Sequence, residues 1–344
     1  MRRALGFVLI GLGVFAIALG LLLRLYAYPR LAKIPLDEKT TSVSTGIASD
    51  VLIVLDEGKD VRVHHNVPLT STMLVEGNLL TPDAKPDGNI AVWREKAQVV
   101  DDMGHIVDAS IRQVCLDRTT SQGVQNCSRG QQYITNKQDS HGRDIVQLTS
   151  QVGQNFKFPF GVEQQSYQFY DTTLRKATEA KFVAEDQIDG IDVYKFVQTI
   201  PDTKLPDAEA VPGSLVGSSE PSVEADRYYR NVRTLWVEPD SGIIIRGQED
   251  QHQELRVPNS TLPPTVVFNG TLAFNGPTVK ANVDRANDAI SQLALVATTG
   301  PTVLIIGGVV LAIGGVLLLV LPGRRPRGKR SADPRRPKAL AGTS

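Results

Sequence analysis

The stretch TVLIIGGVVLAIGGVLLLVLPGRRPRGKR, residues 302–330, is an uncharged apolar run that ends in a cluster of arginine and lysine. A helix needs about 20 apolar residues to cross a bilayer core about 30 Å thick. Residues 303–321 reach this length, and a second uncharged run of the same kind covers residues 4–23. We therefore expect two transmembrane helices, assigned to residues 4–23 and 302–321.

The first apolar run is expected to stay in the mature protein. A cleaved signal peptide has a shorter apolar core, about 7–15 residues, and ends in a small-x-small cleavage site. The residues after Leu23 read RLYAYPRLAKIP, which offers no convincing site of this kind. A cleaved signal peptide with a single membrane anchor is the alternative.

Charge is distributed unevenly, although the formal net charge of the chain is zero. Residues 322–344 hold eight basic residues against one acid, and the segment between the apolar runs has an excess of nine acids over bases. Short basic flanks stay in the cytoplasm, because lysine and arginine beside a span resist translocation. We therefore expect residues 1–3 and a basic, disordered tail over residues 322–344 to be cytoplasmic, and residues 24–301 to form an extracytoplasmic domain. The expected topogenic residues are Arg2, Arg3, Arg324, Arg325, Arg327, Lys329 and Arg330.

The only two cysteines, Cys115 and Cys127, lie in the segment expected outside the membrane. Twelve positions separate them, and no further ligand with metal-site spacing lies nearby. In an oxidising compartment such a pair favours a disulfide over a metal site. Two reduced cysteines are the alternative.

The segment between the spans is rich in short runs of β-branched and aromatic residues, bounded by turn residues such as PDG and PDSG. These runs do not alternate with helical patterns, which favours an antiparallel sheet or barrel. The expected fold class is therefore mainly β (α+β), with two transmembrane helices flanking a large antiparallel β-sheet or barrel-like extracytoplasmic domain with few helices. The runs are Asp50–Leu55, Asn89–Trp93, Ala180–Ala184, Val193–Ile200, Arg233–Glu238, Gly242–Gly247 and Thr265–Phe274.

One helix and two loops are also expected in this domain. Apolar residues recur at helical spacing before Gly300, which predicts a helix leading into the second span. Asp202–Asp226 contains three prolines with small and acidic residues, so we expect a solvent loop there. The polar stretch Asp117–Asp144 is interpreted in the same way. The helical positions are Val283, Ala286, Ile290, Leu293 and Ala297.

The sequence contains no recognisable catalytic motif: GxSxG, the P-loop, HExxH and the dinucleotide fingerprint are all absent. His64 and His65 are adjacent, and neighbours on a strand point to opposite faces, so they make a poor chelate. We therefore expect a protein that is not an enzyme and uses no cofactor or metal. A hydrolase with two distant carboxylates is the alternative.

The order of parts, together with the stretches FKFPFGVEQQSYQFYD and WVEPDSGIIIRGQED, resembles the actinobacterial porin PorA family of two-span envelope proteins. This resemblance implies a role in the cell envelope, where the family has been associated with lipoglycan accumulation. The stretch QIDGIDVYKFVQTIP is similar to a strand of class B scavenger receptors. That similarity implies two spans with both ends inside and a β-rich outer domain threaded by a lipid tunnel.

These observations predict a non-enzymatic cell-envelope membrane protein whose outer domain binds or conveys lipid or glycolipid, or supports lipoglycan assembly. We expect an apolar cavity or groove that opens toward the membrane, with a packed core as the alternative. The expected partners are membrane lipids, a lipid or glycolipid ligand and envelope-synthesis proteins, with no nucleic acid.

Two other functions are open. One is a scaffold for envelope-synthesis enzymes, because small residues four apart, such as Gly308 and Ala312 or Ala16 and Gly20, let spans pack closely. The other is an oligomeric porin-like channel.

Overall fold

The computed structural model describes residues 2–55, 60–136 and 142–321, in two compact units. One unit comprises Met1–Leu22 with Gly300–Ser344, and the other comprises Leu23–Thr299. The basic tail expected over residues 322–344 lies outside the described residues.

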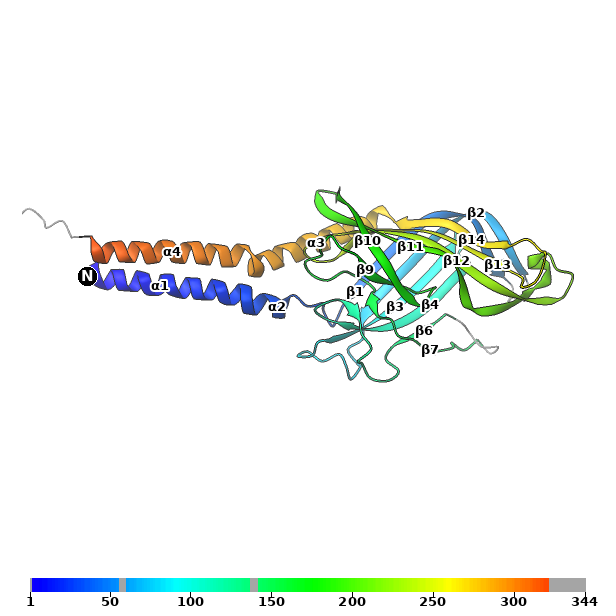
Figure 1. Ribbon diagram of the computed structural model, residues 1–344, viewed down its shortest axis with the longest axis horizontal. Coiled ribbons are helices and arrows are strands. Elements are labelled where there is room, and N and C mark those ends of the chain that lie inside the picture. Colours follow the sequence, from blue (N-terminus) through cyan, green and yellow to red (C-terminus); the bar gives the residue numbers. More distant parts are fainter. Residues whose placement is uncertain (1, 56–59, 137–141, 322–344) are drawn as a thin grey trace, which may run out of the picture. The chain divides into compact units, whose positions relative to one another are not determined.

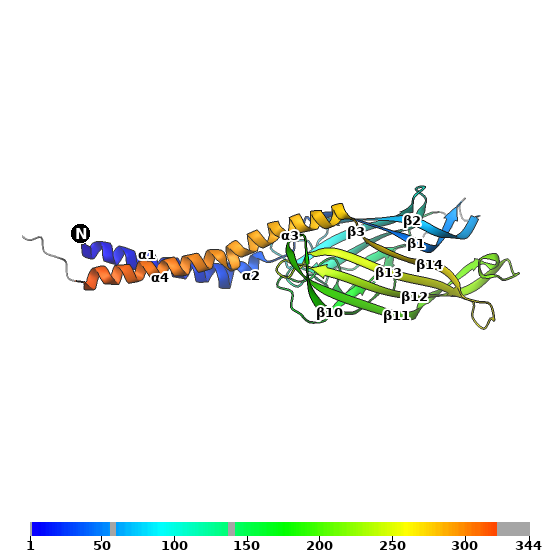
Figure 2. The ribbon, with the colours of Figure 1, turned by 90° about the horizontal axis from the view of Figure 1, so that it is seen from above.

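The first unit is an antiparallel pair of helices, α1 (Arg2–Leu22) and α4 (Thr299–Val320), which run side by side in Figures 1 and 2. Glycines at seven-residue spacing form the contact. A Cβ added to Gly13 would lie 2.5 Å from the Gly308 carbonyl oxygen, and one added to Gly315 would lie 2.6 Å from that of Gly6. Both helices are long and apolar enough to cross a membrane.

The second unit is built around one large sheet of fourteen strands. The pairing β3-β2-β1-β14-β13-β12-β11-β10-β9-β8-β5-β4 returns to β3, so these twelve strands close a barrel, and β6 and β7 extend from β4. Most neighbours are antiparallel, as predicted, whereas β8 and β9 are parallel. The strands are β1 (Lys39–Leu55), β2 (Asp60–Gly77), β3 (Ile90–Asp101), β4 (Ile106–Asp117), β5 (Gln122–Gly123), β6 (Tyr133–Thr135), β7 (Gln147–Leu148), β8 (Gly153–Gln154), β9 (Tyr167–Asp171), β10 (Lys176–Ile188), β11 (Ile191–Pro212), β12 (Ser222–Val237), β13 (Ile244–Arg256) and β14 (Thr265–Phe274).

The two ends of the barrel differ. The chain enters one end through the helical segment η1 (Leu23–Ala27) and α2 (Tyr28–Leu31), followed by the buried Ile34. We call this the entry end; it also holds the turns at residues 189–190 and 238–243. The opposite, far end holds the turns after β1 and β3 and the short helix η3 (Gly213–Val216).

Helix α3 (Gly276–Ala297) covers part of the barrel exterior and confirms the predicted helix. The Asn275 side chain accepts a hydrogen bond from the Thr278 amide at 3.0 Å, which caps the first turn. Val283 and Ala286 are buried against Trp236 on the outer face of β12. Of the predicted apolar face, Val283 and Ala286 therefore pack on the sheet, whereas Ile290, Leu293 and Ala297 are only partly buried.

The prediction of a solvent loop over Asp202–Asp226 is wrong. β11 and β12 stay paired as far as Pro212 and Ser222, and η3 makes the turn between them. Pro206 lies where the register shifts between Lys204 and Ala208, so its missing amide removes no hydrogen bond from the regular ladder.

The stretch Asp117–Asp144 is only partly the expected loop. It contains β5 and β6, and the Ile134 side chain is buried. Residues 137–141 lie outside the described part of the chain.

The barrel interior changes character along its length. Near the entry end, Phe158, Phe196 and Leu235 belong to one buried apolar cluster, and Trp93 and Val114 belong to another. Near the far end the buried residues are aliphatic, such as Val51 and Leu255. Between these apolar layers lie charged and amide side chains.

Candidate functional site

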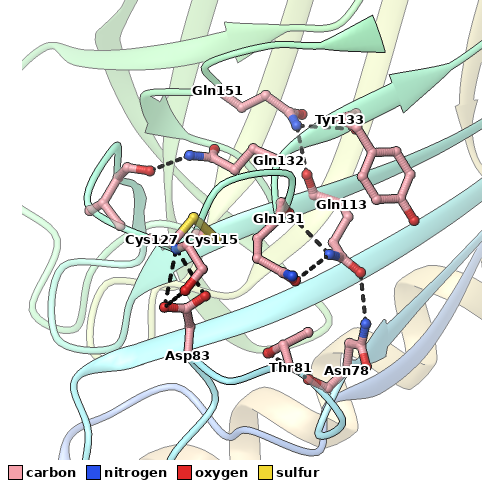
Figure 3. The surroundings of a disulfide bond; sticks show 12 residues. Asn78, Thr81, Asp83, Gln113, Cys115, Cys127, Gln131, Gln132, Tyr133 and Gln151 are labelled. Carbon is pink, nitrogen blue, oxygen red and sulfur yellow. Dashed lines mark hydrogen bonds between the residues drawn. A yellow bond between two sulfur atoms is a disulfide. The ribbon is translucent and has the colours of Figure 1, made fainter. Parts of the chain in front are cut away.

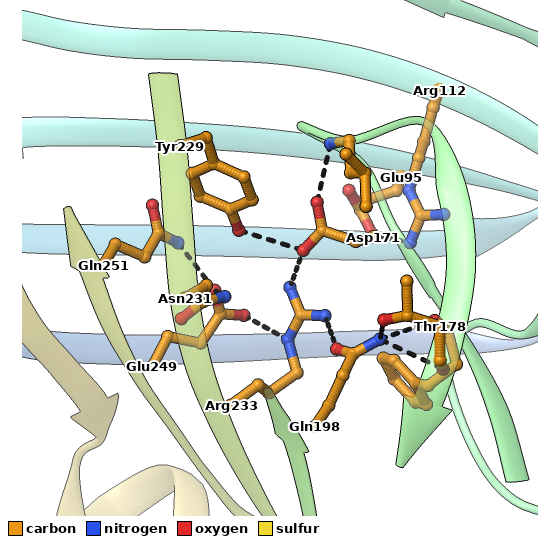
Figure 4. A network of polar contacts seen from close by, with 12 residues as sticks. Glu95, Arg112, Asp171, Thr178, Gln198, Tyr229, Asn231, Arg233, Glu249 and Gln251 are labelled. Atoms are coloured by element: carbon orange, nitrogen blue, oxygen red, sulfur yellow. Dashed lines mark hydrogen bonds and ion pairs between the residues drawn. The ribbon is translucent and has the colours of Figure 1, made fainter. Parts of the chain in front are cut away.

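The middle of the barrel holds a buried polar network centred on Arg233 of β12 (Figure 4). Its guanidinium donates to Asp171 on β9 at 3.0 Å and to Glu249 on β13 at 2.7 Å. It also donates to the amide oxygen of Gln198 on β11 at 2.5 Å. Because β12 and β9 are not neighbours in the sheet, the contact with Asp171 crosses the barrel interior.

The environment fixes the charges of this network. Burial acts to lower the pKa of Arg233, but the carboxylates of Glu249 and Asp171 outweigh it and hold that pKa above its ordinary value. Burial likewise acts to raise the pKa of Glu249, and the charge of Arg233 outweighs it, so that pKa is lowered. Burial and the nearby carboxylates raise the pKa of Tyr229, whose hydroxyl donates to Asp171 at 3.0 Å. These shifts keep Arg233 and Glu249 charged and Tyr229 protonated at neutral pH.

A second buried ion pair lies on the opposite side of the network, between Arg112 of β4 and Glu95 of β3 at 2.8 Å. Arg112 also donates to the side-chain oxygens of Asn155 at 2.7 Å and Gln151 at 3.2 Å. Its guanidinium carbon lies 4.5 Å from the ring centroid of Phe156. We call Arg233, Asp171, Glu249, Arg112 and Glu95 the polar belt.

The entry end is filled by the chain's own segment 156–162. The Phe158 ring stacks on Phe196 with centroids 4.7 Å apart, and the Phe156 ring lies 5.7 Å from Trp93. The Phe158 amide donates to the Gly242 carbonyl at 2.9 Å.

Gly242 is required at this contact. Its φ is +74°, and a Cβ there would lie 2.3 Å from the carbonyl oxygens of both Phe158 and Pro159. The two stretches that carry the family resemblance, residues 156–171 and 236–250, therefore meet at the entry end of the barrel.

Lys157 projects from the same segment. Its Nζ lies 3.7 Å from the centroid of the Phe160 ring, and the residue is half-buried. Burial lowers the pKa of Lys157 to about 7, with the charge of Glu38 opposing this shift and that of Arg285 adding to it. A lysine with a lowered pKa thus lies beside the apolar entry end.

A pocket of about 780 Å³ lies at the far end, lined partly by β1, β2, η3 and β14. Its charged groups are paired with one another: Arg62 donates to Asp60 at 2.5 and 2.6 Å, and His65 lies 2.9 Å from Asp50. Leu215 adds an apolar wall. Because Arg62 pairs with Asp60 and His65 pairs with Asp50, these four side chains give no reason to expect a charged ligand in the pocket.

The predicted disulfide is confirmed: Cys115 and Cys127 are joined, and Figure 3 shows their surroundings. Arg2 and Arg3 begin α1. Their topogenic role stays a prediction, and the other five topogenic residues lie outside the described residues.

Sequence reasoning missed the polar belt. Tyr229, Asn231 and Arg233 alternate along β12 with the same period as the buried Leu235 and Val237, so they face the same side of the strand. This alternation was a usable signal. Within the described ranges, no group of three or more histidine, cysteine, aspartate or glutamate side chains is placed to hold a metal ion.

Comparison with known proteins gives consistent matches along the whole chain. A family model described as "Porin PorA" matches residues 5–317. A Porin PorA of Corynebacterium resistens is 24% identical, with 88% of this chain and 93% of the relative covered. A Porin PorA of Corynebacterium amycolatum is 26% identical, and the match covers 90% of this chain and 96% of that relative.

Proposed function

Because this chain belongs to the porin PorA family, we propose that it is a non-enzymatic membrane protein of the cell envelope whose barrel binds or conveys a lipid or glycolipid. Two spans, α1 and α4, anchor it, with both termini in the cytoplasm and the barrel outside.

The observation that carries this proposal is the sequence of layers inside the barrel. Aromatic and aliphatic side chains such as Phe196 and Leu235 line the entry end, and the polar belt follows directly behind them. Binding sites commonly combine apolar walls with a few polar groups that orient the ligand. An apolar entry backed by ion pairs and amides matches a molecule that has hydrocarbon at one end and a polar head at the other.

The outer surface of the strands supports anchoring by helices rather than by the barrel wall. Glu179 and Lys181 of β10 and Arg230 of β12 point outward and are exposed. A barrel embedded in a membrane carries an apolar outer band instead. The barrel is therefore proposed to lie in water, tied to the bilayer at its entry end by the chain segments that lead to α1 and α4.

Ligand entry requires segment 156–162 to move, because this segment occupies the apolar entry end. Its backbone is held to the 238–243 turn by three hydrogen bonds, from Phe158, Gly161 and Val162. The expected apolar cavity would thus form only when the ligand replaces the rings of Phe156 and Phe158.

Lipid cross-linking tests the proposal. A photoreactive benzophenone amino acid replaces Phe160 in the full chain, and a second variant carries it at the exposed Met103 of the far end as the matched control. We expect lipid adducts at position 160 and none above background at position 103, with mass spectrometry identifying the lipid. Equal adduct yields at both positions, or none at position 160, would contradict the proposal.

A channel is the second candidate, because the relatives are named Porin PorA. Direct contacts such as Arg233 with Asp171 cross the interior, so passage along the barrel would require this network to open. Conductance through planar bilayers, compared between the wild type and Asp171→Asn, tests this. A change of ion selectivity supports passage through the barrel, whereas an unchanged selectivity supports passage between helices of several copies.

A further inference from the structure

We propose that Leu79 and Leu80, in the loop between β2 and β3, insert into the surface of the phospholipid bilayer that α1 and α4 span. This rests on the proposed membrane anchoring and adds a second lipid contact, made by the barrel unit itself. Leu80 is 97% exposed and Leu79 is 54% exposed. Single exposed apolar residues are ordinary, whereas interaction sites expose contiguous apolar surface, and these two leucines are adjacent.

The base of this loop is fixed by the side chain of Asn78. Its oxygen accepts a hydrogen bond from the Leu80 amide at 3.2 Å, and its nitrogen donates to the side chain of Gln113 on β4 at 2.8 Å. The Thr81 hydroxyl donates to the Asn78 carbonyl at 3.3 Å. Figure 3 shows the contact between Asn78 and Gln113. These contacts fix the backbone of the loop, while the side chains of Leu79 and Leu80 stay exposed.

The rest of the loop is fixed by two neighbours. Ser128, next to the disulfide at Cys127, donates to the Asp83 carboxylate from its amide at 3.0 Å and from its hydroxyl at 3.1 Å. The Arg118 guanidinium donates to the carbonyls of Pro86 and Gly88, both at 3.1 Å. The disulfide therefore helps to hold the loop that presents the leucines.

The loop lies at the entry end, close in the chain to the membrane. The Gly77 amide donates to the Glu38 carbonyl at 2.8 Å, and the Trp93 indole donates to the Pro35 carbonyl at 3.0 Å. Residues 35–38 follow α2, which itself continues the apolar helix. The helical segments η1 and α2, which connect α1 to residues 35–38, also expose apolar side chains: those of Leu25, Tyr26 and Leu31. A lipid surface is the occupant that we propose for these positions, because only a short stretch of chain separates residues 35–38 from the apolar helix α1.

Depth-dependent quenching tests the contact. The full chain with Leu80→Trp is reconstituted into phosphatidylcholine vesicles whose acyl chains carry bromine, and its fluorescence is corrected for Trp93 and Trp236, which are both buried. Met103→Trp is the matched control, because Met103 is 78% exposed at the far end. We expect blue-shifted emission and fractional quenching more than about twofold greater at position 80 than at position 103.

The outcomes separate this inference from the proposed anchoring. If both variants float with the vesicles but position 80 is quenched no more than position 103, the lipid contact is refuted and the anchoring stands. If the chains do not float with the vesicles, the anchoring and the contact are both refuted. Unchanged thermal unfolding of both variants verifies that the substitutions leave the barrel folded.

Discussion

Arg233 joins side chains from β9, β11 and β13 in the barrel interior through three hydrogen bonds. A buried ion pair adds little net stability, since desolvation offsets much of its attraction, but removing one partner leaves an uncompensated charge. The polar belt is therefore a point where single substitutions have large effects. Cys115 and Cys127 were predictable because only two cysteines exist, whereas many arginines and carboxylates left the partners of Arg233 undetermined until the strand order was known.

The first prediction concerns Arg233. Arg233→Met leaves the buried Asp171 and the half-buried Glu249 without their cation, which should destabilise the barrel by about 3–5 kcal/mol. Arg230→Met is the control, because Arg230 points outward from the same strand. Thermal unfolding in detergent, followed by circular dichroism, measures both. Equal stability of the two variants would rule out the predicted role of the network.

The second prediction concerns Lys157, whose pKa is lowered to about 7 from 10.5. Between these values the unfolded chain carries the proton and the folded chain does not, so the free energy of unfolding rises with pH. Lys157→Met should remove this rise, measured as the melting temperature between pH 7 and about pH 10. Lys181→Met, at an exposed position, should retain it. A Lys157→Met profile that matches the wild type would disprove the shift.

At the scale of elements, α4 carries two rows of glycine with different surroundings. Gly308 and Gly315 face α1, whereas a Cβ added to Gly307 or Gly314 would meet no described atom within 4 Å. The predicted small pair of Gly308 and Ala312 does lie at the helix contact, opposite Gly13. Hydropathy predicted both helices, but which glycine row faces the partner depends on helix rotation, which apolarity on all sides cannot define.

The third prediction uses these two rows. Gly308→Leu should force α1 and α4 apart toward the ordinary interaxial distance, by about 2 Å or more, whereas Gly307→Leu should not. Spin labels at the exposed positions Phe15 and Val310 report the separation by electron paramagnetic resonance. The same separation in both variants would show that the glycine contact does not set the helix distance.

The fourth prediction concerns the Cys115–Cys127 disulfide. Replacing both cysteines with serine releases a loop twelve residues long and should cost about 3 kcal/mol. Hydrogen exchange should increase around Ser128 and, through Asp83, in the loop that carries Leu80. Faster exchange limited to residues beside the cysteines would show that the disulfide does not support that loop.

Helices and strands were predicted correctly where the local residue pattern determines the structure. The prediction failed where pairing between strands determines it. The run Thr265–Phe274 matches β14 at both ends. The hairpin around η3 was missed because prolines and acids suit a loop locally. In the structure, Val211 and Ala225 are buried against Leu255, and Arg227 pairs with Glu209 at 2.7 Å, so contacts between strands outweigh the local preference.

At the scale of the whole molecule, the sequence predicted an antiparallel sheet or barrel between two spans, but not whether or how the sheet closes. Closure depends on β3 pairing with both β2 and β4, and on β1 pairing with β14. Strand composition does not identify neighbours far apart in the chain. The filled entry end was equally hidden, because the sequence FKFPFG does not show that the rings of Phe156 and Phe158 fill the barrel interior.

The fifth prediction is the topology. Alkaline phosphatase is active only after export, so its insertion after Ser218, in the turn that follows η3, should give activity, and its fusion to the C-terminus should give none. The expected asymmetry follows from the basic tail and the acidic segment between the spans. Activity of the C-terminal fusion would contradict the assignment of both termini to the cytoplasm.

The pairing of β1 with β14 also sets the order of events during synthesis. Under the proposed topology, β1 leaves the translocation machinery first, yet the partner of its residue Ser44 is Phe274, which emerges only after every other strand. Contacts between residues so distant in the chain form slowly, and an open strand edge attracts the edges of other chains. Until β14 has been exported, one edge of β1 therefore remains unpaired. The second membrane helix, α4, follows β14 within a few tens of residues in the chain. Barrel closure and the end of translocation would thus be nearly simultaneous. The nascent chain would be most prone to aggregation between the export of β1 and that of β14.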